Sequence, residues 1–125
     1  MSPFAIQLKK IRIARKLQQN QLADIVGCEP SYVSALETDA KPPPQTDKLI
    51  HFLKKLNLSS EEEANLISTA KVSKRSIRLP LRGPTQLFEI CHALEKKLPM
   101  LSLAQLGMID LVLNVPPSKT EVLKM

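Results

Sequence analysis

QQNQLADIVGCEPSYVSALETDAKPP, residues 18–43, carries the clearest structural signal in the chain. Its first part predicts a short helix over residues 19–26, because apolar residues recur there on one face. Gly27 follows, where a left-handed residue ends a helix at little steric cost. Pro30 then opens a second helix at its first position, where its missing N–H costs nothing. Two short helices joined by a tight turn with a glycine form a helix-turn-helix.

The second helix also shows an inward face and a signal that ends it. Val33, Leu36 and Glu37 recur on the inward face, and the helix is expected to end near Thr38. The run Lys41-Pro-Pro-Pro44 prevents it from restarting. Periodicity alone leaves two interpretations open, a DNA-binding motif and an ordinary helical hairpin in a bundle.

The first half of the chain resembles the lambda-type repressor and Cro family, also called XRE-like. The residues that match in order and spacing are Leu8, Ile11, Arg12, Leu17, Gln19, Leu22, Ala23, Gly27, Tyr32, Val33, Ser34, Leu36, Glu37 and Pro42. The resemblance implies an all-α fold, in which a five-helix lambda-repressor-like DNA-binding domain precedes a C-terminal helical hairpin. It also implies that the second helix of the motif enters the major groove of double-stranded DNA, while the first crosses the backbone.

The outward positions of the motif are the candidate DNA contacts. They are Gln19, Pro30, Ser31, Tyr32, Ser34, Ala35, Thr38 and, in the following loop, Lys41. By resemblance, four of them read bases: Pro30, Ser31, Ala35 and Thr38. Pro30 stands where the family often has a glutamine that binds adenine. Few side chains are therefore available for direct base contacts, and specificity is expected to depend on DNA shape and on lysine contacts.

Three of these residues have a second interpretation. Gln19 either donates to a phosphate and braces the second helix, as the resemblance implies, or is simply solvated. Tyr32 either contacts the sugar-phosphate edge or closes the small core. The loop around Lys41 departs from the family pattern, because Asp39 and Ala40 replace part of a stretch that is usually basic and contains glycine.

The resemblance also implies that Arg12 pairs with Glu37 in a structural ion pair between the first helix and the recognition helix. Breaking such a pair by removing one partner would cost roughly 3–5 kcal/mol. Glu29 is expected to cap the recognition helix. Lys16 and Gln18 depart from the family, which often has glycine at the first of these positions and Ser or Thr at the second.

The remaining elements follow from capping and breaking signals. Ser2 and Pro3 begin a first helix. A fourth helix is predicted over 46–56, with Leu49, Ile50, Leu53 and Leu56 inside, and a fifth over about 61–72 from a capping box at Ser60–Glu63. The predicted domain boundaries are 1–73 for the DNA-binding domain, 74–84 for a basic connector, 85–114 for a C-terminal helix pair and 115–125 for a frayed tail. In the connector, Ile77, Leu79 and Leu81 alternate with other residues at strand spacing. We interpret it as a docked linker, with a basic arm on DNA and a strand exchanged between subunits as alternatives.

The C-terminal pair consists of a helix up to about Leu98, stopped by Pro99, and a second over about 103–114 with a capping box at Ser102–Gln105. The second of these is apolar on more than one face. Two helices of about 30 residues together cannot enclose a core of their own. We therefore expect a homodimer, with contacts guessed at Leu103, Leu106, Met108 and Leu113.

Composition narrows the function further. Residues 1–58 carry nine Lys or Arg against five Asp or Glu, whereas residues 85–125 carry four of each. A basic N-terminal part beside a neutral C-terminal part is typical of a DNA-facing and a protein-facing region. The two cysteines and two histidines lack metal-ligand spacing, so no metal site and no cofactor are expected, and Cys91 is expected to be a core residue. No membrane span or signal peptide is expected either, so a cytoplasmic protein is predicted.

The sequence thus predicts a transcriptional regulator, most simply a repressor that binds a palindromic operator as a homodimer. Activation is not excluded, because the motif serves both. The alternative is the DNA-binding antitoxin of a toxin–antitoxin pair, whose C-terminal helices bind the toxin. No catalysis is expected, since the chain lacks a Ser–Lys dyad in a β-rich domain and a Gly-rich phosphate loop. A pure interaction module would bind no DNA.

Overall fold

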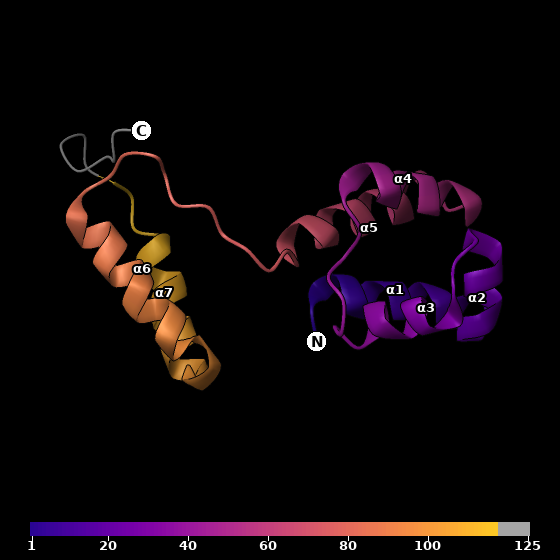
Figure 1. Cartoon of the computed structure of the whole chain (residues 1–125), viewed down its shortest axis with the longest axis horizontal. Coiled ribbons are helices and arrows are strands. Elements are labelled where there is room, and N and C mark those ends of the chain that lie inside the picture. Colours follow the sequence, from indigo (N-terminus) through magenta and orange to yellow (C-terminus); the bar gives the residue numbers. More distant parts are fainter. Residues whose placement is uncertain (118–125) are drawn as a thin grey trace. The chain divides into compact units, whose positions relative to one another are not determined.

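The computed structural model of the 125-residue chain describes residues 1–117, and it contains two compact units. The first unit is Met1–Ile77 and the second begins at Arg78. Every regular element of the described residues is helical, which confirms the all-α prediction (Figure 1). None of these helices has the length and apolar character needed to span a membrane. Most of the predicted tail, from residue 118 onward, lies outside the described residues.

The first unit consists of five helices. Their bounds are α1 Pro3–Ala14, α2 Gln19–Val26, α3 Pro30–Glu37, α4 Thr46–Lys55 and α5 Ser60–Val72. The start signals predicted for α1 and α3 and the stop signal predicted for α2 are confirmed. Ser2 is the N-cap of α1, where its hydroxyl accepts a hydrogen bond from the Ala5 N–H at 3.2 Å. Gly27 ends α2 in the left-handed conformation at φ 79°, and Pro30 stands at the start of α3.

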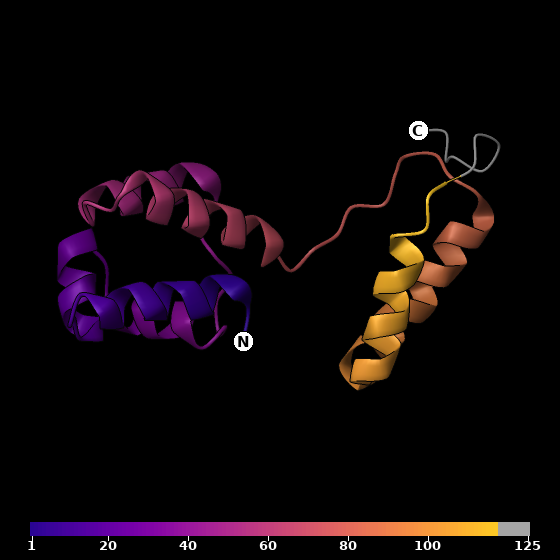
Figure 2. The same ribbon diagram turned by 180° about the vertical axis from the view of Figure 1, so that it is seen from behind.

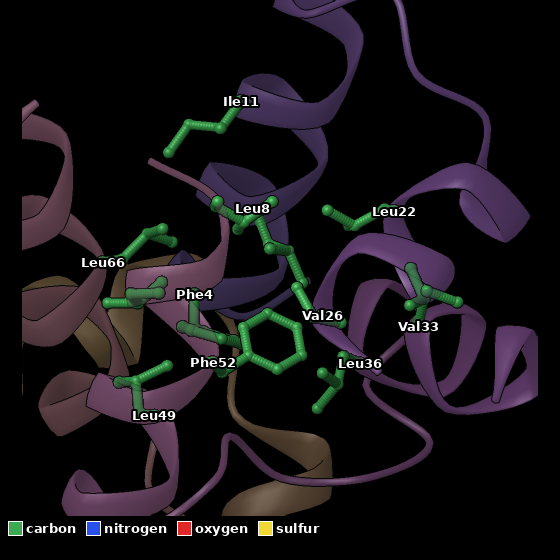
Figure 3. Close-up of a cluster of buried hydrophobic side chains, with 13 residues drawn as sticks. Phe4, Leu8, Ile11, Leu22, Val26, Val33, Leu36, Leu49, Phe52 and Leu66 are labelled. Carbon is green, nitrogen blue, oxygen red and sulfur yellow. The ribbon is translucent and has the colours of Figure 1, made fainter. Parts of the chain in front are cut away.

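One apolar core holds these five helices together. Figure 3 shows side chains from all of them meeting between the helices. The buried set is Phe4, Leu8, Ile11, Leu22, Ala23, Val26, Val33, Leu36, Leu49, Phe52, Leu53, Leu56 and Leu66. Helix α1 packs on both α3 and α5, and α2 also packs on α3, so both α1 and α2 support the second helix of the motif.

Two details of α4 and α5 correct the sequence-based predictions. Phe52 is buried, whereas Ile50, which was expected inside, is only half-buried. The cap of α5 is Ser59 rather than Ser60: its hydroxyl accepts from the Glu62 N–H at 3.2 Å, and Glu62 accepts from the Ser59 N–H. Both Ser-x-x-Glu pairs fit the capping pattern. The pair that forms also places Glu62 against Arg15, the C-cap residue of α1.

Backbone at positive φ occurs at three residues other than glycine. They are Lys16 at 56°, Asp39 at 64° and Asn57 at 55°. Lys16 is the position at which the family often has glycine, so the departure noted in the sequence is a residue in a conformation that glycine adopts more readily. The turn between α1 and α2 forms nonetheless.

The connector leaves the first unit along irregular backbone. The boundary between the units falls at Ile77 and Arg78, inside the predicted connector rather than at its start. Ile77 is 84% exposed and Leu81 is 96% exposed. The prediction that the connector docks through its alternating apolar residues is therefore wrong at these two side chains.

The second unit contains α6 Thr85–Lys97, the short 3₁₀ turn η1 Leu98–Met100, and α7 Leu103–Leu113. The helices α6 and α7 lie side by side as a hairpin (Figures 1 and 2). The capping box of α7 is confirmed, since the Ser102 hydroxyl accepts from the Gln105 N–H at 3.1 Å. Pro99 does not stop α6 abruptly, because it lies within the 3₁₀ turn that continues the helix.

No described residue of the second unit is buried. Cys91, which was expected to be a core residue, is only half-buried. The large apolar side chains exposed on the hairpin are Phe88, Ile90, Leu98, Met100, Leu103, Leu106, Met108, Leu111, Val112 and Leu113.

Candidate nucleic-acid interface

The recognition helix α3 divides its residues between the core and the surface. Val33 and Leu36 are buried in the apolar core. Pro30 and Ser31 are exposed at the start of the helix, and Thr38 is exposed directly after it. Ser34 and Ala35, the other two proposed contacts on this helix, are half-buried. The polar surface of α3 is therefore concentrated at its two ends.

A buried carboxylate fixes α3 to the first helix. Glu37 is 2% exposed, and its Oε2 lies 2.7 Å from Arg12 Nε. A second hydrogen bond joins Arg12 Nη2 to Glu37 Oε1 at 3.0 Å, so the guanidinium binds the carboxylate through two nitrogens. Arg12 Nη1 also donates to the Leu17 carbonyl oxygen at 2.8 Å. The hydrogen bond to Glu37 raises the pKa of Arg12, and the pair links α1, the turn after it and α3.

Gln19 joins the same network from the start of α2. Its Nε2 donates to Glu37 Oε1 at 3.2 Å. One amide hydrogen is thus directed at the recognition helix, which is the bracing contact that the family resemblance implied. At the same helix end, the Gln18 N–H donates to Gln21 Oε1 at 2.8 Å. The Gln21 N–H, which a Ser or Thr cap would bind, instead donates to Asn20 Oδ1 at 2.9 Å.

The end of α3 differs from its start in hydrogen bonding. The Thr38 hydroxyl donates to the Ser34 carbonyl oxygen at 2.8 Å. Its oxygen retains lone pairs, so Thr38 is suited to accept a hydrogen bond from a base. At the start of the helix, Glu29 is the N-cap residue by backbone conformation, but its side chain makes no capping hydrogen bond. The prediction that Glu29 caps the helix is wrong for the side chain.

Tyr32 and Lys41 lie together beside α3. Tyr32 is half-buried and packs against the core, and burial, followed by the neighbouring Cys28, raises its pKa. The ammonium of Lys41 lies 5.6 Å from the centroid of the tyrosine ring. The Lys41 N–H also donates to the Ala35 carbonyl oxygen at 3.2 Å. The ring and the backbone together hold this exposed cation next to the recognition helix.

A polar cluster after α3 was not found from the sequence. The Asp39 carboxylate accepts from the Ser2 N–H at 2.6 Å and from the Ser2 hydroxyl at 2.5 Å, and these bonds lower the pKa of Asp39. Arg75 Nη2 donates to the Asp39 carbonyl oxygen. Asp39 has positive φ, which an aspartate tolerates better than most residues. An aspartate two residues past the end of α3 was the only available signal.

Ser73 contributes two further hydrogen bonds near the start of α1. Its hydroxyl accepts from the Phe4 N–H at 3.0 Å and donates to the Thr69 carbonyl oxygen at 2.6 Å. The cluster thus joins the starts of α1 and of the connector to the end of α3. Within the described residues, no group of three or more His, Cys, Asp or Glu could hold a metal ion.

The comparisons agree with this geometry. The helix-turn-helix family model matches residues 8–62, which run from α1 into α5 and include the whole motif. No curated protein and no solved structure matches the chain. Residues 8–62 are therefore a helix-turn-helix domain of the XRE-like, lambda-type family, whose members are DNA-binding regulators.

Proposed function

We propose that this protein is a cytoplasmic repressor that binds a palindromic operator as a homodimer. The observation that carries the proposal is the arrangement of α3. Its inner side is fixed by the core and by the Arg12–Glu37–Gln19 network, while Ser31 and Thr38 face outward at its two ends. A rigid helix with polar residues on its free side is suited to the major groove.

Affinity would come mainly from phosphate contacts. Lys41 lies at the edge of α3 on the Tyr32 ring, and Lys9, Lys10 and Lys16 are exposed on and after α1. Each phosphate neutralised by a lysine releases counterions, so binding weakens steeply as salt rises. Base contacts from Ser31, Thr38 and the Ala35 methyl group would add a modest direct code, with DNA shape supplying the rest.

The second unit is proposed to join two copies. The hairpin exposes Leu103 at 88%, Met108 at 66% and Leu113 at 77%, which is more apolar surface than a hairpin in water retains without a partner. Leu106, at 47%, belongs to the same surface. A two-fold dimer places its recognition helices in half-sites about one helical turn apart, roughly 10 bp.

The same exposed hairpin supports one alternative, in which its partner is a toxin and the protein is an antitoxin. The two functions predict different complexes. A repressor dimer is stable alone, whereas an antitoxin co-purifies with a small protein of different sequence when the two are expressed together.

The proposal is tested by measuring binding to an operator selected from random DNA. Ser31→Ala and Thr38→Ala are expected to relax base preference with a modest loss of affinity. Lys41→Ala is expected to weaken all sequences alike and to reduce the slope of log K against log salt by about 1. Lys96→Ala, in α6, is the control. If Thr38→Ala changes nothing on the matched operator, the proposed reading face is wrong.

A further inference from the structure

The first unit has a groove outside the DNA-reading residues. It lies between the proline run after α3, the first turn of α4 and the last turns of α5, and its volume is about 460 Å³. This is within the range of about 300–1,000 Å³ that ligand sites occupy. The family resemblance and the proposed function assign nothing to it.

The walls of the groove are apolar. Pro43 and Pro44 form one side, and Ile67 and Ala70 of α5 form the other, with Leu49 of α4 between them. Leu49 is buried, whereas the prolines, Ile67 and Ala70 are half-buried. These side chains therefore offer part of their apolar surface to an incoming group.

The rim of the groove is cationic. Lys71, Lys74 and Arg75 line it, and all three are exposed. No residue that lines the groove is acidic. Arg75 donates to the Asp39 carbonyl oxygen, and the nearby Asp39 carboxylate offsets part of its charge, so Lys71 and Lys74 carry most of the charge of the rim. Gln45, which precedes α4, makes no side-chain cap, and the first turn of α4 adds its partial positive charge, offset in part by Asp47.

We propose that this groove binds a short acidic segment of a partner protein, in which large apolar side chains alternate with carboxylates. The apolar walls would bury the apolar side chains, and the lysines and Arg75 would pair with the carboxylates. A DNA backbone would satisfy the cations but would leave the apolar walls uncovered. Charge complementarity and the apolar walls together therefore favour a peptide.

The test selects phage-displayed random dodecapeptides on the full-length protein and compares variants by fluorescence anisotropy. Lys71→Glu/Lys74→Glu reverses the rim. Thr46→Trp blocks the groove from an exposed position without changing its charge. Lys96→Glu/Lys97→Glu, in α6, makes the same charge change elsewhere. Denaturation midpoints show whether each variant is folded.

The expected result is enrichment of peptides that combine large apolar residues with at least two carboxylates. Their affinity should fall at least about tenfold in Lys71→Glu/Lys74→Glu, should fall in Thr46→Trp, and should stay unchanged in the α6 control. No enrichment, or peptides that bind the rim variant equally well, would overturn the proposal.

Two other results would also overturn it. If the rim reversal weakens binding to random duplex DNA about tenfold more than the α6 reversal, the cations contact phosphates instead. If Thr46→Trp changes the sedimenting mass, a second copy occupies the groove. Because peptide binding is scored without DNA, failure of the repressor proposal would leave this test intact.

Discussion

The two units of the chain contain similar helices but differ in what those helices bury. In the first unit, residues from all five helices meet in one core, and even the charged Glu37 is covered. In the described part of the second unit, no residue is buried, although α7 is almost wholly apolar. Both units have well-formed caps, at Ser59 and at Ser102. Caps and periodicity determine a helix locally, whereas burial requires a third surface that two helices do not supply.

The largest expected effect comes from removing one aromatic ring in each unit. Phe4→Ala, at 1% exposure, should lower the free energy of unfolding by about 3–5 kcal/mol, because it leaves a cavity. Phe88→Ala, at 41% exposure on α6, should cost less than half as much. Urea denaturation followed by circular dichroism measures both. Equal losses would mean that the hairpin is as well packed as the first unit.

The two ion pairs of the first unit should differ in how much they stabilise it. Arg12→Met strands Glu37, which is 2% exposed, and should cost about 3 kcal/mol. Arg15→Met removes the matching partner of Glu62, whose side chain is 31% exposed, and should cost less than about 1 kcal/mol. The same denaturation experiment measures them. An Arg12→Met variant as stable as Arg15→Met would show that Glu37 is not the anchor of the recognition helix.

Two glycines should respond to alanine in opposite directions. Gly27 has φ 79° and the Lys55 ammonium lies 3.3 Å from the position of an added Cβ, so Gly27→Ala should destabilise the first unit by about 1 kcal/mol. Gly107 lies inside α7 with nothing within 4 Å of such a Cβ. Gly107→Ala should therefore raise the helicity of α7 and stabilise it by up to about 1 kcal/mol.

The direction of the Gly107→Ala effect also tests whether the hairpin packs against a second copy of the chain. If Gly107→Ala instead weakens self-association in sedimentation experiments, a helix of the second copy approaches closely at that position. A stabilised Gly27→Ala variant would contradict the strained turn in the first unit.

The smallest effect is a dependence on acid. Hydrogen bonds from Arg15, then from the Ser59 N–H, lower the pKa of Glu62 to about 2, from an ordinary value of 4.5. The folded pKa is the lower one, so the stabilisation is complete above pH 4.5 and is lost as the pH falls toward about 2. Glu62→Gln should flatten the unfolding free energy over that window, measured by urea titration at several pH values. Glu61→Gln, one position earlier, is the control and should leave the dependence intact.

The features that the sequence could predict are local ones, whereas contacts between residues far apart in the chain could not be predicted. The helices, the Gly27 turn and the α7 cap follow from local rules that involve a few neighbouring residues. The choice between Ser59 and Ser60 as the cap could not be made locally, because a contact with Arg15 on a distant helix accompanies it. The Ser2–Asp39 contact joins residues 37 positions apart, and no spacing rule connects them.

The candidate site shows the same limit. Periodicity predicted that Val33 and Leu36 are buried, and the family resemblance predicted the ion pair between Arg12 and Glu37. Neither indicated that Tyr32 supports Lys41 or that Thr38 uses its hydrogen within the helix, since both depend on loop and side-chain geometry. The docked connector was predicted from alternation alone, which does not reveal whether a surface is available to receive it.

The proposal that the first unit reads DNA while the hairpin dimerises is tested most directly by selecting binding sites from a random DNA pool. The selection is done once with the full chain and once with residues 1–77. We predict a two-fold symmetric site with the full chain and single half-sites with residues 1–77, because we propose that the hairpin joins the two copies. Symmetric sites from both proteins would place the dimer contact in the first unit and leave the hairpin for another partner. No enriched site from either would contradict the proposal that α3 reads DNA.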